Sequence, residues 1–138
     1  GSSYQLGEER IEGLAVAPLH TVREPGPRLI GNVSIEVDLG SGPRVLAGFE
    51  NHGGRTYIDA GGRPLGTVIH GHGNNGRDGL EGIVVGNLIG TYLHGPCLAR
   101  NPQIADLLLG WATGTELPFI EEPEVTQLRE ERLRTVLG

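Results

Sequence analysis

The stretch "LIGNVSIEVDL", residues 29–39, decides the fold because apolar and polar side chains alternate along most of it. A two-residue period places alternate side chains on opposite faces of an extended strand. One face is predicted to carry Val33, Ile35 and Val37, and the other Asn32, Ser34, Glu36 and Asp38. We therefore predict a half-buried strand here, in a fold built around a sheet.

Further short apolar runs lie on both sides of this strand, each bounded by Gly, Pro, Asn or Asp. They cover residues 11–19, 44–50, 55–58, 65–69, 82–85 and 87–94. The 24 glycines fall between these runs and show no repeat, which favours a turn-rich β architecture over disorder. The middle of the chain is predicted to be mostly β.

Two helices are predicted to close the chain. Asn101 suits the N-cap position of the first and Pro102 its first turn, and the helix is expected to end before Gly114. Its apolar residues recur at i, i+3, i+4 and i+7, which predicts one face packed on the sheet: Ile104, Leu107, Leu108 and Trp111.

The second helix is predicted within "EEPEVTQLREERLRTVLG", residues 121–138. Acids and Pro123 stand at its start and arginines toward its end, which complements the helix dipole. Glu130 and Arg134 have the i, i+4 spacing of an ion pair. A thinner apolar stripe, suited to the domain or to a partner, consists of Val125, Leu128, Leu133 and Val136.

Length and composition exclude several classes of protein. The 138 residues fit a single domain, 1–138, whose opening residues 1–3, "GSS", are interpreted as a cloning remnant. A net charge of -6 without a basic cluster argues against a nucleic-acid partner, and no apolar run is long enough to insert into a membrane. All eleven basic residues are Arg, which excludes lysine chemistry. A single cysteine favours the reducing cytoplasm.

The stretch "NLIGTYLHGPCLARNP", residues 87–102, contains the first candidate for chemistry. His94 ends an apolar run before a Gly-Pro turn, where a strand end commonly presents its side chain to a cleft. A hydrogen-bonded structural histidine fits the same spacing. Cys97 shares a turn with His94, but nucleophile and base usually come from separate segments, so Cys97 is interpreted as a small apolar residue.

For two other polar stretches, a purely structural role is at least as well supported by the sequence as a role in chemistry. "FENHGGRTYI", residues 49–58, places Glu50, Asn51, His52 and Arg55 around Gly-Gly and is typical of a polar hairpin end. "HGHGNNGRDG", residues 70–79, offers His70, His72 and Asp78. A structural zinc site needs four ligands that converge on the metal, and only two here have suggestive spacing, so we predict no metal site. We interpret this segment as a loop that covers a site or packs on a partner.

Taken in order, four blocks resemble one family of enzymes. "LIGNVSIEVDL", "GFENHGGRTYI", "GHGNNGRDGLEG" and "GNLIGTYLHGP" followed by "NP" are similar to the glutamine amidotransferase subunits of lipid II isoglutaminyl synthase. These subunits are cobyric-acid-synthase-like class I amidotransferases. The resemblance extends from Tyr4 to Trp111 and implies the C-terminal portion of an α/β, flavodoxin-like domain.

The resemblance implies a glutaminase that passes ammonia to a Mur-ligase-like partner. That partner would use ATP and a metal ion to amidate the D-glutamate of lipid II, while this chain needs no cofactor of its own. By the resemblance His94 is the histidine that acts as base and then acid for a cysteine nucleophile. Arg28, in "RLIGN", falls where the family carries an arginine that recognises glutamine.

The chain departs from the family at the nucleophile. The family's strand-to-helix elbow reads Cys-Gly-Gly-Tyr-Gln, whereas this chain reads "GSSYQ", which keeps Tyr4 and Gln5 and lacks the cysteine. The domain is therefore expected to be N-terminally truncated and inactive alone, and the acid that orients His94 is expected from elsewhere, such as the partner ligase. Two alternatives stay open: a non-catalytic partner-binding module and an amidotransferase domain for a corrinoid substrate.

Overall fold

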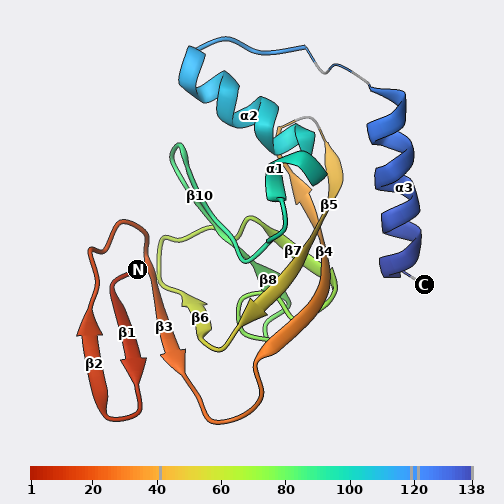
Figure 1. Cartoon of the computed structure of the whole chain (residues 1–138). Helices are drawn as coiled ribbons and strands as arrows, with labels where there is room; N and C mark the ends of the chain where they lie inside the picture. Colours follow the sequence, from red (N-terminus) through yellow and green to blue (C-terminus); the bar gives the residue numbers. More distant parts are fainter. Residues whose placement is uncertain (41, 119, 121, 138) are drawn as a thin grey trace.

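The computed structural model of the chain describes residues 1–40, 42–118, 120 and 122–137 (Figure 1). Its strands fall into three sheets, and its helices come at the end of the chain. The strands are β1 Ser3–Leu6, β2 Glu9–Glu12, β3 Leu19–Arg23, β4 Leu29–Asp38, β5 Pro43–His52, β6 Arg55–Ile58, β7 Gly66–His70, β8 Leu80–Glu81, β9 Ile83–Val85 and β10 Leu88–Gly90. The helices are α1 Cys97–Arg100, α2 Pro102–Thr113 and α3 Pro123–Leu137.

The predicted strand at residues 29–39 is confirmed as β4, which lies inside the sheet ordered β5-β4-β7-β8. Val33, Ile35 and Val37 are all buried, as their alternation predicts. Together with Leu46, Leu65, Leu93 and Ile104 they form the hydrophobic core. Ser34, predicted on the polar face, is also fully buried, so that face of β4 is not wholly open to solvent.

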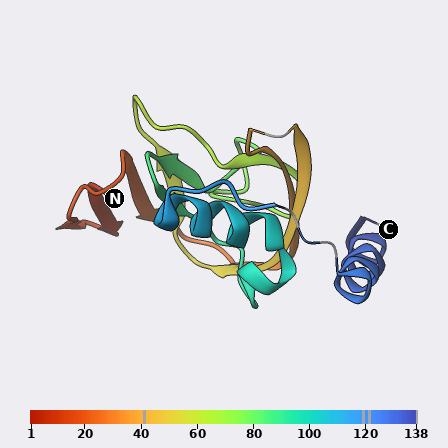
Figure 2. The same ribbon diagram turned by 90° about the horizontal axis from the view of Figure 1, so that it is seen from above.

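The N-terminal strands form a second sheet, ordered β2-β1-β3-β6, that projects from one end of the molecule (Figures 1 and 2). Among the described strands, β1 and β3 are the one parallel pair, and the others pair antiparallel. The protein is thus a mixed α/β structure dominated by strands. The predicted flavodoxin-like arrangement is not confirmed by these sheets.

The prediction of an apolar segment at 11–19 is only partly met. β2 ends at Glu12, and the chain then runs through a loop in which Leu14 is 91% exposed and Ala15 has a φ of 51°. Residues 1–3 take part in the same sheet, because Ser3 opens β1 and the Ser2 amide donates to the Leu19 carbonyl over 2.7 Å.

The prediction of a polar hairpin end at 49–58 is wrong, because β5 and β6 belong to different sheets. The Gly-Gly pair lets the chain cross from one sheet to the other. The Arg23 guanidinium occupies the place of a Cβ at Gly53, and the Thr21 methyl group crowds that of Gly54. A side chain at Gly54 would press on Thr21 of β3, whereas one at Gly53 would require the flexible Arg23 side chain to move.

The helices follow the prediction with two corrections. α2 begins at Pro102 and ends before Gly114, whose φ of 68° is the left-handed conformation of a C-cap. Its Ile104 is 2% exposed in the core. The four-residue α1 was not predicted, since so short a segment shows no periodicity. Asn101 precedes α2 without a side-chain capping bond, because its amide is bound elsewhere.

α3 lies beside β4 and β5, separate from α2 (Figures 1 and 2). The predicted ion pair is confirmed, with 3.4 Å between Arg134 Nη2 and Glu130 Oε2. Val125 and Leu128 of the predicted stripe remain 40% and 63% exposed, whereas Leu133 is half-buried. The side chain of Val136 lies outside the described residues. Within the described residues, no helix is long and apolar enough to cross a membrane.

Candidate active site

The candidate site is built on the outer edge of β5, the last strand of its sheet. Alternate residues of an edge strand direct their backbone N–H and C=O groups away from the sheet. On β5 these residues include Ala47, Phe49 and Asn51. Each of these three residues receives a hydrogen-bonding partner from outside the sheet.

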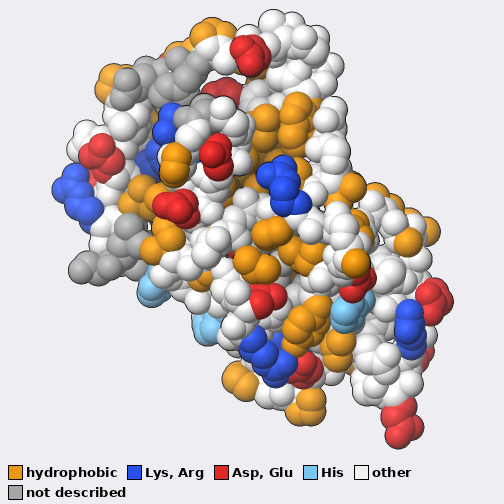
Figure 3. Space-filling model, turned by 180° about the vertical axis from the view of Figure 1, so that it is seen from behind, with side chains coloured by type: hydrophobic (Ala, Val, Ile, Leu, Met, Phe, Trp, Pro, Cys, Tyr) orange, Lys and Arg blue, Asp and Glu red, His pale blue; other side chains and the backbone are white. Residues whose placement is uncertain are grey.

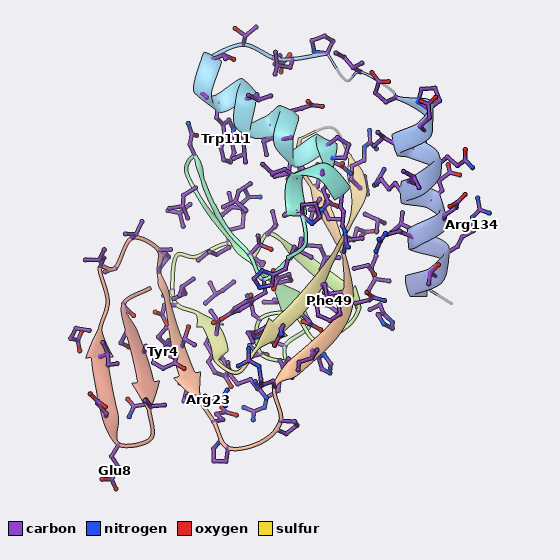
Figure 4. The ribbon with its side chains drawn as sticks, in the orientation of Figure 1. Tyr4, Glu8, Arg23, Phe49, Trp111 and Arg134 are labelled. Carbon is purple, nitrogen blue, oxygen red and sulfur yellow. The ribbon has the colours of Figure 1, made fainter. Side chains whose placement is uncertain are left out.

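His94 binds the middle of this edge through its backbone. Its N–H donates to the Phe49 carbonyl over 3.0 Å, and its C=O accepts from the Phe49 N–H over 3.2 Å. This isolated bridge fixes the backbone of His94 while its side chain stays exposed. Gly95 follows with a φ of 68° and turns the chain toward α1. Phe49 on β5 is marked in Figure 4.

The prediction that one strand runs through 87–94 is wrong, because β10 ends at Gly90. Side chains bind the backbone from that point on. Glu81 Oε1 accepts from the Tyr92 N–H over 2.7 Å and from the Thr91 hydroxyl over 2.6 Å. Thr91 Oγ1 in turn accepts from the Leu93 N–H over 3.0 Å. A buried glutamate thereby replaces a neighbouring strand just before His94.

Asn101 binds the second position of the β5 edge with its side chain. Its Oδ1 accepts from the Ala47 N–H over 2.9 Å, and its Nδ2 donates to the Ala47 carbonyl over 2.9 Å and to the Cys97 carbonyl over 2.8 Å. Asn101 is fully buried, so its amide imitates the peptide group of an adjacent strand. The segment between His94 and Asn101 is therefore attached to β5 at both ends.

Arg28 binds Asn51, the third of the outward-facing residues of the β5 edge. Its Nε donates to Asn51 Oδ1 over 2.9 Å and its Nη2 to the Asn51 carbonyl over 2.9 Å. Outward-facing positions of a strand repeat about every 7 Å. The structure thus attaches Arg28 and His94, both predicted from the sequence, to successive positions of one strand edge. The Arg28 guanidinium is already engaged by Asn51, an arrangement that the sequence did not indicate.

A buried acid and two imidazoles lie next to this edge. Glu50 is fully buried and accepts from the His72 amide, His72 Nδ1 and the Gly73 amide over 2.7, 2.8 and 2.9 Å. Burial alone would raise the pKa of Glu50, but the imidazoles of His52 and His72 and the two amides outweigh it and hold the pKa below its usual value. Glu50 therefore pins the loop at 71–73 to β5.

Glu81 has the opposite environment. It is fully buried, and burial raises its pKa even though Thr91 and the Tyr92 amide favour the carboxylate. Glu81 Oε2 and His52 Nε2 have no hydrogen-bond partner among the described residues. The His52 ring stacks on Tyr92 with 3.6 Å between ring centroids. Glu81 and Tyr92 were not predicted as site residues, since burial of a polar residue leaves no pattern in the sequence.

Tyr4 and Gln5, predicted as the remnant of an elbow, lie within β1. In the described residues the next helix after them is α1, so a strand-to-helix turn is not formed here. Gln5 Nε2 donates to the Gly7 carbonyl over 2.6 Å. The Tyr4 ring and the Tyr92 hydroxyl both lie close to Gly54, which brings β1 near the segment that leads to His94. Tyr4 is marked on β1 in Figure 4.

The remaining candidates have structural partners. Cys97 begins α1 against the core, and burial raises the pKa of its thiol, which disfavours the reactive thiolate. His72 binds Glu50, while Asp78 accepts from the Asn75 side chain and the Leu80 amide. Within the described part of the chain, the structure brings together no group of three side chains suited to a metal ion.

Comparison with known proteins identifies the family. The profile of the CobB/CobQ-like glutamine amidotransferase domain matches residues 2–102 of the chain. The chain belongs to this family. The resemblance predicted from the sequence blocks is therefore confirmed, and His94 lies within the matched residues.

Relatives of this amidotransferase domain include two proteins named lipid II isoglutaminyl synthase (glutamine-hydrolyzing) subunit GatD. The one from Staphylococcus aureus (strain N315) is 44% identical over 92% of the chain and 50% of the relative. The one from Streptococcus pneumoniae (strain ATCC BAA-255 / R6) is 36% identical over 89% and 49%. A cobyric acid synthase from Pelotomaculum thermopropionicum is 41% identical over 48% of the chain and 12% of that protein. The chain thus spans about half the length of the GatD relatives.

Proposed function

We propose that this chain is the histidine-bearing part of a cytoplasmic glutaminase that supplies ammonia for the amidation of lipid II. The acceptor of the ammonia would be the D-glutamate of the stem peptide, activated with ATP and a metal ion by a Mur-ligase-like partner. Two GatD relatives that each match about nine tenths of the chain support this substrate class over a corrinoid. The cobyric acid synthase match covers only about half of the chain.

The observation that carries the proposal is the position of His94. Two backbone hydrogen bonds hold it on the edge of β5 while its imidazole faces solvent. A fixed, accessible imidazole can take a proton from a thiol and return it to a leaving amine. Arg28 is attached to the next outward-facing position of the same edge and would bind the carboxylate of glutamine with its remaining donors.

In the proposed reaction a cysteine sulfur attacks the side-chain amide carbon of glutamine after His94 accepts the thiol proton. His94 then gives this proton to the departing nitrogen, and ammonia leaves behind a thioester. Water, deprotonated by His94, breaks the thioester to glutamate and restores the thiol. Cys97 is a poor nucleophile because of its burial, so the cysteine would come from an elbow outside this chain. The flavodoxin-like arrangement would belong to the domain that includes this elbow.

The test is ammonia release from glutamine. The isolated chain is expected to give none. A chimera that joins the chain, from Tyr4 on, to the part of the Staphylococcus aureus relative that it does not match is expected to be active with the ligase partner, because by the family resemblance that part would carry the cysteine. His94→Ala should lower its kcat by at least about 100-fold, the usual scale of general acid–base catalysis.

The matched control is His70→Ala, which removes another exposed imidazole of the same chain and should leave turnover unchanged. Retained activity of the His94→Ala chimera would exclude His94 from the mechanism. Turnover by the isolated chain would show that it needs no outside nucleophile. An inactive chimera that still binds the ligase would favour a non-catalytic binding module.

A further inference from the structure

A groove separates α3 from the surface of β5 and α1. Its volume is about 330 Å³. α3 lines it with four residues spaced i, i+3, i+4 and i+7, so a single helix face borders the groove: Val125, Leu128, Arg129 and Arg132. Arg100 at the end of α1 faces them. We call this feature, lined by Val125, Leu128, Arg129, Arg132 and Arg100, the arginine groove.

The arginine groove concentrates positive charge in a chain whose net charge is -6. The ion pairs of the described residues do not include Arg100, Arg129 or Arg132. Arg129 Nη2 donates to the Val45 carbonyl over 2.6 Å, a neutral partner. Burial lowers the pKa of Arg100, and the nearby Arg132 lowers it further. The guanidinium groups of Arg100 and Arg132 repel each other, and a bound anion would relieve that repulsion.

The groove also presents apolar surface. Val125 and Leu128 are 40% and 63% exposed, and Pro96 and Ala99 lie across from them. A small anion such as phosphate would neutralise the arginines but leave this surface exposed to water. A peptide segment that carries both acidic and apolar side chains would satisfy both parts of the groove.

The location ties the groove to the candidate site. Its floor includes Ala47 and Gly48 of β5. Ala47 is bound by Asn101, and the next outward-facing residue along β5 is the one that holds His94. An occupant of the groove would therefore lie against the strand that positions His94.

We propose that the arginine groove docks an acidic, partly apolar segment of a partner protein. This inference rests on the proposed function, in which the partner is the Mur-ligase-like subunit. Carboxylates of the segment would pair with Arg100 and Arg132, and an apolar side chain would cover Leu128. The pairing would bring the partner to the edge of β5 and speed its association through charge attraction.

The experiment measures binding of the intact chain to the purified ligase subunit by calorimetry at two salt concentrations. Arg100→Glu and Arg132→Glu are each expected to weaken binding at least about tenfold at low salt and to reduce its salt dependence. The control is Arg134→Glu, because Arg134 lies on the same helix, pairs with Glu130 and points away from the body of the molecule (Figure 4). It should bind almost as the unchanged chain does.

A second variant, Arg132→Gln, removes the charge with little change to the helix, and circular dichroism would confirm that α3 is retained. Unchanged affinity of both Arg132 variants and of Arg100→Glu would overturn the groove as the docking site. A third measurement is titration with inorganic phosphate, followed by the NMR chemical shift of the Arg132 amide. A saturable shift, with ligase binding unaffected by the arginine substitutions, would mean that the groove binds a small anion and not a peptide segment. In the chimera, His94→Ala should abolish ammonia release without weakening ligase binding, so the two assays separate a failure of the proposed function from a failure of the groove.

Discussion

At the scale of single residues, Glu50 is the side chain on which the loop at 71–73 depends. Its two oxygens accept three hydrogen bonds from His72 and Gly73. Glu50→Gln replaces one carboxylate oxygen by an NH2 group. That group cannot accept a hydrogen bond and would face an N–H donor of His72 or Gly73. We expect a loss of about 2–3 kcal/mol in the free energy of unfolding at pH 7, measured by urea denaturation.

The pH dependence of this loss follows from the lowered pKa of Glu50. A group with a depressed pKa in the folded state stabilises the protein above its unfolded value, about 4.3, and ceases to do so as pH falls through the folded value. The difference between Glu50→Gln and the unchanged protein should therefore shrink below about pH 4. A difference that stays constant from pH 7 to pH 3 would contradict the ionised state of Glu50.

Glu81→Gln is the matched control, because Glu81 is equally buried but has a raised pKa. Its contribution to stability is complete below the unfolded pKa of about 4.3 and is lost as pH rises through the folded value. Replacement by the neutral glutamine should thus cost less at pH 7 than at pH 4, the reverse of Glu50→Gln. The same trend in both variants would show that the pKa values of the two carboxyls are not shifted in opposite directions.

At the scale of elements, Asn101 joins the start of α2 to β5. Asn101→Ala would leave the Ala47 N–H and the Ala47 carbonyl without their partner, whereas the Cys97 carbonyl would keep its hydrogen bond from the backbone N–H of residue 101. Buried groups without partners cost about 1–3 kcal/mol each, so we expect a total loss of about 3 kcal/mol in the free energy of unfolding. Faster hydrogen exchange of the Ala47 and His94 amides should accompany it.

Asn32→Ala is the control for this prediction, since Asn32 is an exposed asparagine on the neighbouring strand β4. It should change stability by no more than about 0.5 kcal/mol. Equal effects of the two substitutions would show that the side-chain amide of Asn101 does not carry the attachment. Unchanged exchange at His94 would show that its position is independent of Asn101.

Elements with a strong local pattern could be predicted from the sequence, and elements set by tertiary contacts could not. β4 alternates over several residues, and α2 combines an apolar face with Pro102 and Gly114, so both were found. The end of β10 depends on a buried Glu81 that is distant from the strand, and no local pattern indicates it. Asn101 was given a capping role for the same reason: its sequence position fits a cap, whereas its partner Ala47 is 54 residues away.

The candidate site shows the same division. His94 and Arg28 were predicted through the family resemblance, and their shared attachment to β5 gives that prediction a geometry. The sequence could not show that Asn51 holds Arg28 or that His52 stacks on Tyr92, because these contacts join separate segments. Residue type and spacing identify candidates for chemistry, but the fold decides which of them meet.

At the scale of the whole molecule, buried side chains are distributed unevenly between the two larger sheets. The core consists of residues from β4, β5 and the segments that pack on them. β2, by contrast, is exposed at all four positions, and Leu6 and Ile11 of the projecting sheet are 47% and 49% exposed. On the face opposite to that of Figure 1, hydrophobic side chains also form a broken band down the middle of the molecule (Figure 3). We therefore expect the extent of burial, and not the number of strands, to determine which sheet resists local unfolding.

We predict that native-state hydrogen exchange separates these sheets. Amides of β4 that bond to β5 and β7 should exchange only through global unfolding. Amides of β2, and those of β1 that bond to β2, should exchange through local opening at several kcal/mol less. Leu46→Ala, which removes a fully buried core side chain, should cost about 2–5 kcal/mol and lower the protection of β4 by that amount. It should leave β2 unchanged, because opening of β2 does not disturb the core. Equal loss of protection in β2 and β4 would instead mean that the two sheets unfold as a single cooperative unit.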